Sequence, residues 1–579
     1  MRRILTASAL LAACLVMAAC GSSSNNTPTS NLAALTGTYV FQEQVYTYYS
    51  GVDGVHAPAG MTSKALRPVK VVGQRTKALQ VMHSRSQQGP SHGVPAQGNI
   101  YSNVYWGGVV GALQFDGQGN VIGGEVDYNE PTGGGYFADT LSGVYTVNSD
   151  NTGTISLISN NVGAQFSFEF GLQGSTNGSP ATEAQIVEGE EDTVGDIEIG
   201  TGTMLPVEGT PSQGSINGNY VFGLQGQTCY GTPCIQSNQG DLYAAGLFAA
   251  NGSGTFGSGS QADVSDGFAS GNLGLSGTYV APDVNGRATA SLTPTSSTGS
   301  PGQLPTGYVF YIANSSTFFI LSTDNNNTAT GLSPYVFGQA GLQSGTPALS
   351  GSYVMAESTE DLANEAAGNA DTYSDTYLAL LGSSGGALTG TGDSNKAGTV
   401  TTGVVYNYGA YKVASNGRVT FPTSSTTPSG APAPVFWLQS GSFGYGVDQL
   451  QGNTTQQEPG LLSLYQQSGS PFSAASLSGN YALGTLPAST SLANLTVGIV
   501  TSDGTSNLSG DIGVASLEGS SLNSATATYQ MTATGRGTTS GSGNSVFGNG
   551  VLYVVSPSQT LFMDLNSQDT APSIQNMQQ

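Results

Sequence analysis

The chain has 579 residues, only 8% of them charged, and its 36 acidic residues against 13 lysines and arginines give a formal net charge of −23. A protein this acidic is a poor partner for nucleic acid, because phosphate binding requires a basic face. The 84 glycines, with 27 tyrosines and 20 phenylalanines to build cores, favour extracellular β-structure over helical or disordered protein.

The first twenty residues have the order of a secretory signal. Arg2 and Arg3 form a positive start, residues 4–17 are mostly apolar, and two alanines lead into Cys20. About 16 apolar residues are too few to cross a bilayer, which needs roughly 20. The segment resembles the lipobox of bacterial lipoproteins. That resemblance implies cleavage before Cys20 and a thiol that carries diacylglycerol and fatty acyl chains such as palmitate; the alternative is an ordinary secretory signal with a chance cysteine.

The residues that follow predict how the chain is held. Residues 1–19 are interpreted as the signal peptide and residues 20–34 as a flexible tether, because the latter are rich in Gly, Ser, Asn and Thr. The second mature position is Gly21 and not aspartate. In a cell with two membranes this favours the outer membrane, on its periplasmic side or at the cell surface.

Residues 54–100 differ in composition from their surroundings. They hold all three histidines and six of the 13 lysines and arginines, and no acidic residue lies between Asp53 and Asp116. We interpret the segment as a Gly/Pro/Ser-rich flexible insertion; the alternative is an electrostatic contact with anionic lipid or polysaccharide. The histidine spacing matches no common metal site, so no metal is expected. The six basic residues that would make such a contact are Lys64, Arg67, Lys70, Arg75, Lys77 and Arg85.

A short motif repeats along the chain. Leu35-Thr-Gly-Thr-Tyr39 returns around Tyr220, Tyr353 and Tyr481, and the tyrosines lie 181, 133 and 128 residues apart. Without the basic insertion, four units of about 125 residues remain. Each unit has an internal echo of the motif followed by a turn and a further strand. The turns in the last three units are Asn285-Gly-Arg, Asn416-Gly-Arg and Thr534-Gly-Arg.

These units predict an all-β protein of four tandem antiparallel domains. About eight short strands in a meander favour a barrel-like closure, with a β-sandwich as the alternative. We expect separately folded units joined by flexible linkers. The expected domains are 35–209, which includes the insertion at 54–100, then 214–341, 348–468 and 475–579. The Leu-Ser-Gly-x-Tyr starts and Asp/Asn-Gly turns are similar to those of tandem β-domain lipoproteins of bacterial envelope families, a resemblance that implies no catalytic residue.

Few residues outside the signal offer chemistry. In an oxidising compartment Cys229 and Cys234 are expected to form a disulfide; a metal site would need two further ligands. The densest acidic run is interpreted as a solvated loop, with a weak Ca²⁺ site as the alternative. No cofactor is expected. The acidic run comprises Glu188, Glu190, Glu191 and Asp192.

The sequence therefore predicts a lipid-anchored, non-enzymatic cell-envelope protein with a structural or binding role, whose partners are the membrane and polysaccharide or other envelope components. Serine hydrolysis is disfavoured, since no histidine lies outside the 56–92 window to act as base. A glycan-acting hydrolase with paired carboxylates is a weaker alternative, because no unit carries an evident acidic cluster within its strands. A carbohydrate-binding adhesin is the other alternative. It would use exposed aromatics such as Tyr46, Tyr48, Tyr49, Tyr101, Tyr105 and Trp106.

Overall fold

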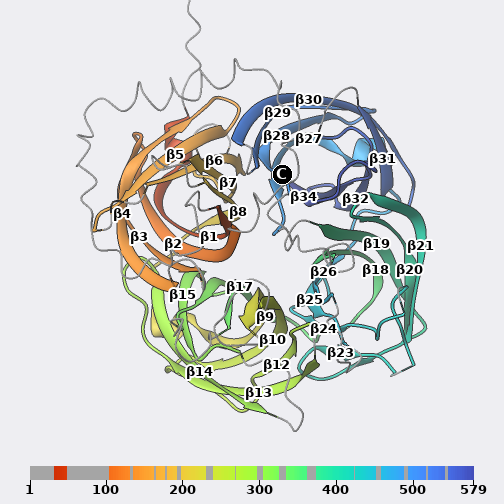
Figure 1. The fold of residues 1–579 in the computed structure, drawn as a ribbon, viewed down its shortest axis with the longest axis horizontal. Coiled ribbons are helices and arrows are strands. Elements are labelled where there is room, and N and C mark those ends of the chain that lie inside the picture. Colours follow the sequence, from red (N-terminus) through yellow and green to blue (C-terminus); the bar gives the residue numbers. More distant parts are fainter. Residues whose placement is uncertain are drawn as a thin grey trace, which may run out of the picture.

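The computed structural model shows a chain built from antiparallel β-sheets (Figure 1). It describes residues 31–48, 104–130, 135–161, 163, 165–175, 179–191, 197–229, 239–267, 269–296, 304–324, 334–361, 373–422, 424–428, 430–450, 458–487, 493–516, 519–541 and 546–579. No helix in these ranges has the length and apolar content needed to cross a bilayer. The strands form four sheets, which we call units 1 to 4 in chain order.

Unit 1 is a closed eight-stranded barrel preceded by the 3₁₀-helix η1 (Leu32–Ala34). It closes because the last strand pairs with the first, from Tyr39 opposite Pro206 to Tyr48 opposite Ile197. Its strands are β1 (Thr36–Tyr48), β2 (Val104–Asp116), β3 (Asn120–Glu130), β4 (Gly135–Val147), β5 (Thr152–Ser159), β6 (Gln165–Gln173), β7 (Glu183–Glu191) and β8 (Ile197–Pro206).

Unit 2 follows the 3₁₀-helix η3 (Gln213–Ser215) and also closes, since its first strand pairs with both the second and the last. Its strands are β9 (Asn217–Cys229), β10 (Gln239–Asn251), the short β11 (Thr255–Phe256), β12 (Gln261–Ser265), β13 (Ser270–Tyr279), β14 (Arg287–Ser296), β15 (Gly307–Asn314), β16 (Thr317–Ser322) and β17 (Tyr335–Leu342).

Unit 3 is an open barrel, because β21 and β22 do not pair. Prolines 422, 428, 432 and 434 lie between β23 and β24, and proline cannot donate to a sheet ladder. Its strands are β18 (Gly351–Glu360), β19 (Ser374–Ser384), β20 (Ala387–Lys396), β21 (Thr399–Ala410), β22 (Lys412–Val413), β23 (Arg418–Thr420), β24 (Val435–Leu438), β25 (Phe443–Val447) and β26 (Leu461–Gln466).

Unit 4 follows the 3₁₀-helix η5 (Ala474–Ser476) and is a closed eight-stranded barrel. The strands of unit 4 are β27 (Ser478–Thr485), β28 (Leu495–Asp503), β29 (Asn507–Ser516), β30 (Gly519–Met531), β31 (Arg536–Gly541), β32 (Gly550–Ser556), β33 (Gln559–Asp564) and β34 (Ile574–Gln578). The predicted all-β fold of four barrel-like units is thus confirmed over the sandwich alternative.

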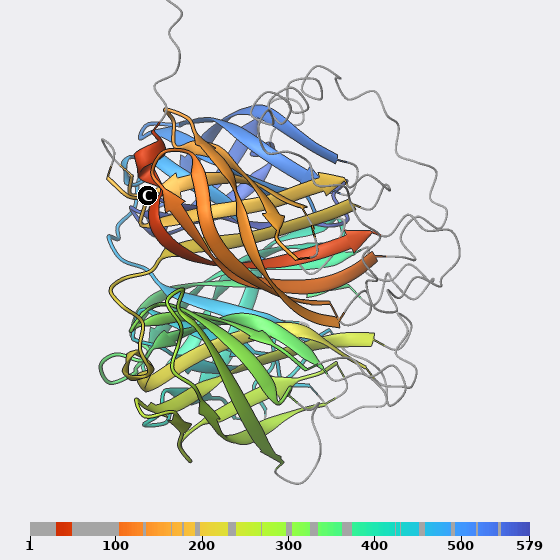
Figure 2. The same ribbon diagram turned by 90° about the vertical axis from the view of Figure 1, so that its left-hand side faces the viewer.

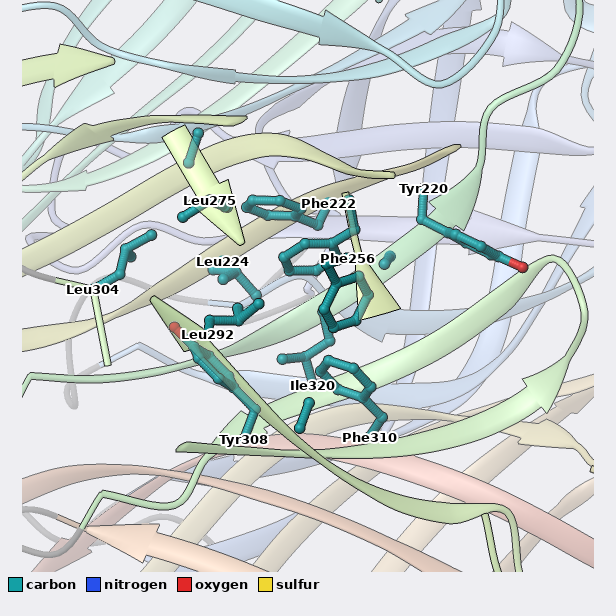
Figure 3. Packing of buried hydrophobic residues seen from close by; sticks show 14 of the residues in the cluster. Tyr220, Phe222, Leu224, Phe256, Leu275, Leu292, Leu304, Tyr308, Phe310 and Ile320 are labelled. Atoms are coloured by element: carbon teal, nitrogen blue, oxygen red, sulfur yellow. The ribbon is translucent and has the colours of Figure 1, made fainter. Parts of the chain in front are cut away.

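Side chains fill the interior of the barrels. In unit 2, alternate residues of each strand point inward, and aromatic rings from several strands meet in the core (Figure 3). Phe222 stacks on Phe248 with ring centroids 4.2 Å apart, and Phe310 lies 5.0 Å from Phe318. This interior is a packed core and not a cavity for an apolar ligand.

The repeated tyrosines explain why the motif recurs. Tyr220 is buried and its hydroxyl donates to the carbonyl oxygens of Ser315 (2.7 Å) and Ser215 (3.0 Å). The tyrosine of the internal echo, Tyr279, donates to the carbonyl of Ile216 at 2.6 Å. The equivalent hydroxyls donate to carbonyls between β6 and β7, between β24 and β25, and between β32 and β33. These bonds are Tyr39 to Ala181, Tyr353 to Gly441 and Tyr481 to Pro557. Each pair of tyrosines ties the start of a unit to its far side.

Tyr220→Phe should lower the free energy of unfolding by about 1–2 kcal/mol, because it leaves buried carbonyl oxygens without their donor. Tyr308→Phe is the matched control in the same core. The Tyr308 hydroxyl is buried and, within the described residues, has no hydrogen-bond partner, so its removal should be neutral or stabilising. Urea titration of the three proteins checks this; equal effects of the two substitutions would contradict the role given to Tyr220.

The four units are arranged as a ring (Figures 1 and 2). Strands β1 and β2 of unit 1 pack on β15–β17 of unit 2, and β9 and β10 pack on β24–β26 of unit 3. Strands β18 and β19 pack on β32 and β33 of unit 4, and β27–β30 of unit 4 pack on β6–β8 of unit 1. Such a head-to-tail contact generates a ring when the rotation closes. We call the contacts of units 1–2, 2–3, 3–4 and 4–1 junctions 1, 2, 3 and 4.

The ring corrects the expectation of separate units on flexible linkers. Each linker makes a turn at a glycine with positive φ, at Gly209, Gly345 and Gly469. The chain beside these turns bonds to the next unit, for example through Gln343 Nε2 to the carbonyl of Leu438 and Gln467 Nε2 to the carbonyl of Val554, at 2.8 and 2.7 Å. The linkers are therefore part of the packed structure.

Candidate functional site

Most site residues predicted from the sequence lie outside the described part of the chain. This holds for Cys20, for Cys234 and the Cys229 side chain, and for the six basic residues of the insertion. Of the acidic run, the side chains of Glu190, Glu191 and Asp192 are likewise not described. Glu188 is described, and the interpretation of a solvated loop is wrong for it, because it lies on strand β7 and is buried. Lipidation, the disulfide and the anionic contact therefore stay predictions.

Two of the aromatic residues considered for sugar binding are buried by packing between units 1 and 2. Tyr46 and Trp106 are 2% and 4% exposed and stack on each other, with ring centroids 6.2 Å apart. Trp106 also meets Tyr335 of unit 2 edge-on. These rings form part of junction 1, so they are not available to stack on a glycan.

Unit 1 carries a cluster of carboxyl groups inside its barrel. Glu43, Glu188 and Glu198 lie on three different strands and alternate with core residues, so all three point inward. Burial raises the pKa of Glu43 well above its ordinary value, and the nearby charge of Glu198 raises it further, while hydrogen bonding to Glu188 opposes the shift. Glu43 therefore holds its proton at pH values where a solvated glutamate is ionised.

Unit 3 has a second buried carboxyl pair. Glu357 on β18 and Asp448 just after β25 are hydrogen-bonded to each other inside the barrel. Burial raises the pKa of Asp448 to about 6, and burial with the charge of Asp448 raises that of Glu357 well above its usual range. Beside them Asp375 pairs with Lys396 at 3.5 Å and accepts a hydrogen bond from Tyr377 at 3.0 Å.

The sequence-based expectation that strands carry no acidic cluster is therefore wrong. The clusters escape notice because each contributing strand supplies one carboxyl, and only barrel closure brings them together. Their geometry does not suit glycoside hydrolysis, which requires carboxyl groups about 5 Å or more apart on either side of a substrate, whereas Glu357 and Asp448 bond directly to each other. Within the described residues, no three His, Cys, Asp or Glu side chains are placed to hold a metal ion.

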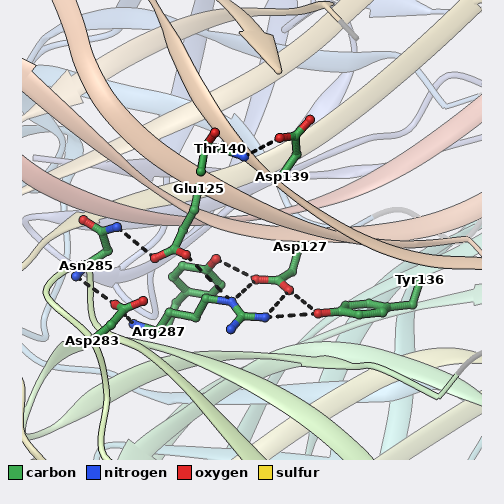
Figure 4. A network of polar contacts seen from close by, with 9 residues as sticks. Glu125, Asp127, Tyr136, Asp139, Thr140, Asp283, Asn285 and Arg287 are labelled. Atoms are coloured by element: carbon green, nitrogen blue, oxygen red, sulfur yellow. Dashed lines mark hydrogen bonds and ion pairs between the residues drawn. The ribbon is translucent and has the colours of Figure 1, made fainter. Parts of the chain in front are cut away.

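The most developed polar site lies at junction 1 (Figure 4). Arg287, at the start of β14, makes a bidentate ion pair with Asp127 of unit 1, with Nε–Oδ2 and Nη2–Oδ1 distances of 2.7 Å. Tyr311 donates to the same carboxylate at 2.6 Å, as does Tyr136. Asn285 donates to Glu125 of unit 1 at 2.9 Å. Asp127 is fully buried, so these donors replace the water that its charge has lost.

The same arrangement recurs at the next two junctions. Each consists of a fully buried aspartate on β3, β12 or β20 of one unit, with an arginine and an aromatic donor from the next unit. At junction 2, Arg418 Nε lies 2.7 Å from Asp263 Oδ2 and Trp437 Nε1 donates to that oxygen at 2.8 Å. At junction 3, Arg536 and Tyr553 both bond to Asp393 Oδ2 at 2.6 Å. We call each set an Asp–Arg–aromatic latch.

The sequence contains one signal for these latches, which is the arginine that follows the glycine of three repeated turns. Only five basic residues follow Arg85, and the three arginines among them each come after the glycine of a repeated turn. Gly286, Gly417 and Gly535 have positive φ, which accounts for the glycines. A turn requires no arginine at the next position. Its recurrence in a chain so poor in positive charge indicates a shared contact.

Comparisons with known proteins add little. No protein-family model and no curated protein matches the chain. Among solved structures, one similarity is to transferrin binding protein B of Haemophilus parasuis, described as a vaccine antigen. The identity is 10%, the match covers 71% of this chain and 85% of that chain, and the TM-score is 0.17. At that TM-score the likeness carries no argument about fold or function.

Proposed function

We propose that this chain is a lipid-anchored, non-enzymatic protein of the bacterial cell envelope, in which a ring of four barrels acts as a rigid structural or binding scaffold. The observation that carries the scaffold role is the latch, built three times from the same residue types at the same places. Units held by buried ion pairs keep a fixed relative geometry, as a binding surface made of several units requires. The packed barrels and mutually bonded carboxyl groups support a role without catalysis.

The lipobox-like residues before Cys20 support the anchor. In the native host, the full chain should incorporate an alkyne-tagged fatty acid and sediment with membranes, whereas Cys20→Ser should lose both the label and the membrane fraction. Cys14→Ser is the matched control, since Cys14 lies inside the apolar run and should leave labelling unchanged. Membrane association and labelling that persist in Cys20→Ser would refute the anchor.

Antibody access to the ring in intact cells distinguishes a scaffold on the cell surface from one in the periplasm. An antibody against unit 4 should stain intact cells if the scaffold meets external partners such as polysaccharide. Staining only after permeabilisation would place the ring in the periplasm, and its partners would then be wall or envelope components.

A further inference from the structure

Junction 4 lacks the arginine and the aromatic residue of the latch. In the latched units the arginine lies directly opposite the aromatic residue on the neighbouring strand of its own sheet. The three pairs are Arg287–Tyr311, Arg418–Trp437 and Arg536–Tyr553. In unit 1 the same position in the register is occupied by Thr152 opposite Gly171. Neither residue supplies a charge.

The aspartate is missing as well. In unit 1, Val110 lies six residues before the turn that begins at Asp116, and Asp127 is its partner on the neighbouring strand. In unit 2, Ala245 lies six residues before the turn at Asn251, and its partner is Asp263. In unit 4 the residue six positions before the turn at Asp503 is Val497, and Gly513 lies opposite it. All three positions of the latch are therefore replaced at this one junction.

Small residues and one carboxyl group occupy the space. Gly171 lies against the backbone carbonyl of Gly498, and the Glu169 side chain occupies the space that a side chain at Gly513 would need. Burial raises the pKa of Glu169. The nearest titratable residue on the facing strand is Asp511, also an acid. A cavity of about 20 Å³ remains between the units, lined by Ser167, Glu169, Val187, Gly189, Val514, Ala515 and Ser520.

Junction 4 is held by smaller apolar side chains and by a buried hydrogen bond from Thr201 Oγ1 of unit 1 to the carbonyl of Thr485 of unit 4, at 2.7 Å. Junctions 1 and 2 bury large rings such as Trp106, Phe337 and Trp437 between the units, and junction 3 buries Tyr553. At junction 4, unit 1 contributes aliphatic side chains, Val187 and Ile199, against alanine, leucine and valine of unit 4. Smaller side chains bury less apolar area and stabilise a contact less.

We propose that junction 4 is a releasable seam: the ring opens there into an arc of four units while junctions 1 to 3 remain closed. Opening uncovers the outer faces of β6–β8 and β27–β29, which face each other in the closed ring. These two faces are complementary to one another and become available only in the open form. The inference concerns the fold and does not depend on the proposed cellular role.

Cysteine labelling tests the seam under native conditions. Ala515 at junction 4 and Ala245 at junction 2 are 2% and 0% exposed, so Ala515→Cys and Ala245→Cys place matched thiols beneath the two contacts. In the full chain, with labelling of the parent protein subtracted, a bulky maleimide should modify Ala515→Cys at least tenfold faster. Equal rates at the two sites would overturn the proposal. Ala493→Cys, fully buried at the same seam, replaces Ala515→Cys if that variant does not fold.

A crosslink distinguishes opening of the seam from unfolding of unit 4. A Cβ atom on Gly189 would lie 3.5 Å from that of Ser520, and a disulfide requires about 3.5–4.5 Å. Gly189→Cys with Ser520→Cys should therefore lock the ring when oxidised. Labelling of Ala493→Cys in this background should be slow when oxidised and recover on mild reduction. Fast labelling of the locked form would show that the thiol is reached by unfolding and would overturn the seam.

Discussion

Asp263→Ala will lower the free energy of unfolding by about 3–5 kcal/mol, because it leaves a partly buried guanidinium and a buried indole N–H without their acceptor. Arg418 is 27% exposed in its side chain and Trp437 is fully buried, so water cannot replace the lost carboxylate well. Urea titration of the full chain measures the loss. Trp437 is one of two tryptophans, and its emission reports junction 2 directly.

Two controls separate the latch from a general effect of losing a charge. Asp511→Ala removes an exposed aspartate of unit 4 and should change stability by less than about 0.5 kcal/mol. The double variant Asp263→Leu with Arg418→Met removes both charges and should recover much of the loss, because buried ion pairs are often replaceable by apolar side chains. A cost for Asp263→Ala no greater than that of Asp511→Ala would remove the basis for the latch.

The protein will be more stable near pH 5 than near pH 8. Burial is the largest cause of a raised pKa at Glu125 and Glu183, to about 7, and at Asp375, Asp448 and Asp564, to about 6. In the unfolded chain these groups ionise near pH 4, so between about pH 4 and 7 the folded state binds more protons. Its stability then falls as pH rises through that window. The sum is on the order of 5 kcal/mol after allowing for solvent screening.

Thermal unfolding at a series of pH values checks this prediction. Glu183→Gln is the informative variant, because the amide mimics the protonated acid and should flatten part of the slope between pH 5 and 8. Asp116 works in the opposite direction, since hydrogen bonds from Asn120 lower the pKa of its exposed carboxyl, but its solvent-screened effect is small. A midpoint temperature that rises steadily from pH 5 to 8 would contradict the assignment.

Local chemistry made the fold predictable. Period-two alternation, Asp/Asn-Gly turns and recurring tyrosines all act within one unit, over distances that a sequence pattern can encode. The turn at Asp116 shows this well: its carboxylate accepts hydrogen bonds from the backbone N–H groups of Gln118 and Asn120 at 2.7 and 2.9 Å, while Gly117 and Gly119 adopt positive φ. Such a turn is specified by its own residues.

The candidate site was less predictable, because its residues come from different strands and units. Asp127 and Arg287 are 160 positions apart, and neither lies in an acidic or basic run. The inward carboxyl groups of Glu357 and Asp448 are separated in the same way. Nothing near either residue in the chain marks it as buried, and only closure of the sheet withdraws it from water and raises its pKa.

The sequence by itself determined the class of the protein, the number of its repeats and the kind of strand and turn in each, since these follow from side-chain alternation and turn chemistry. Tertiary structure alone decided that the units form a ring, that three arginines bind buried aspartates of the preceding unit, and that junction 4 has no such latch. These features depend on which outer faces meet, and a pattern that repeats within each unit cannot specify how one unit packs on the next.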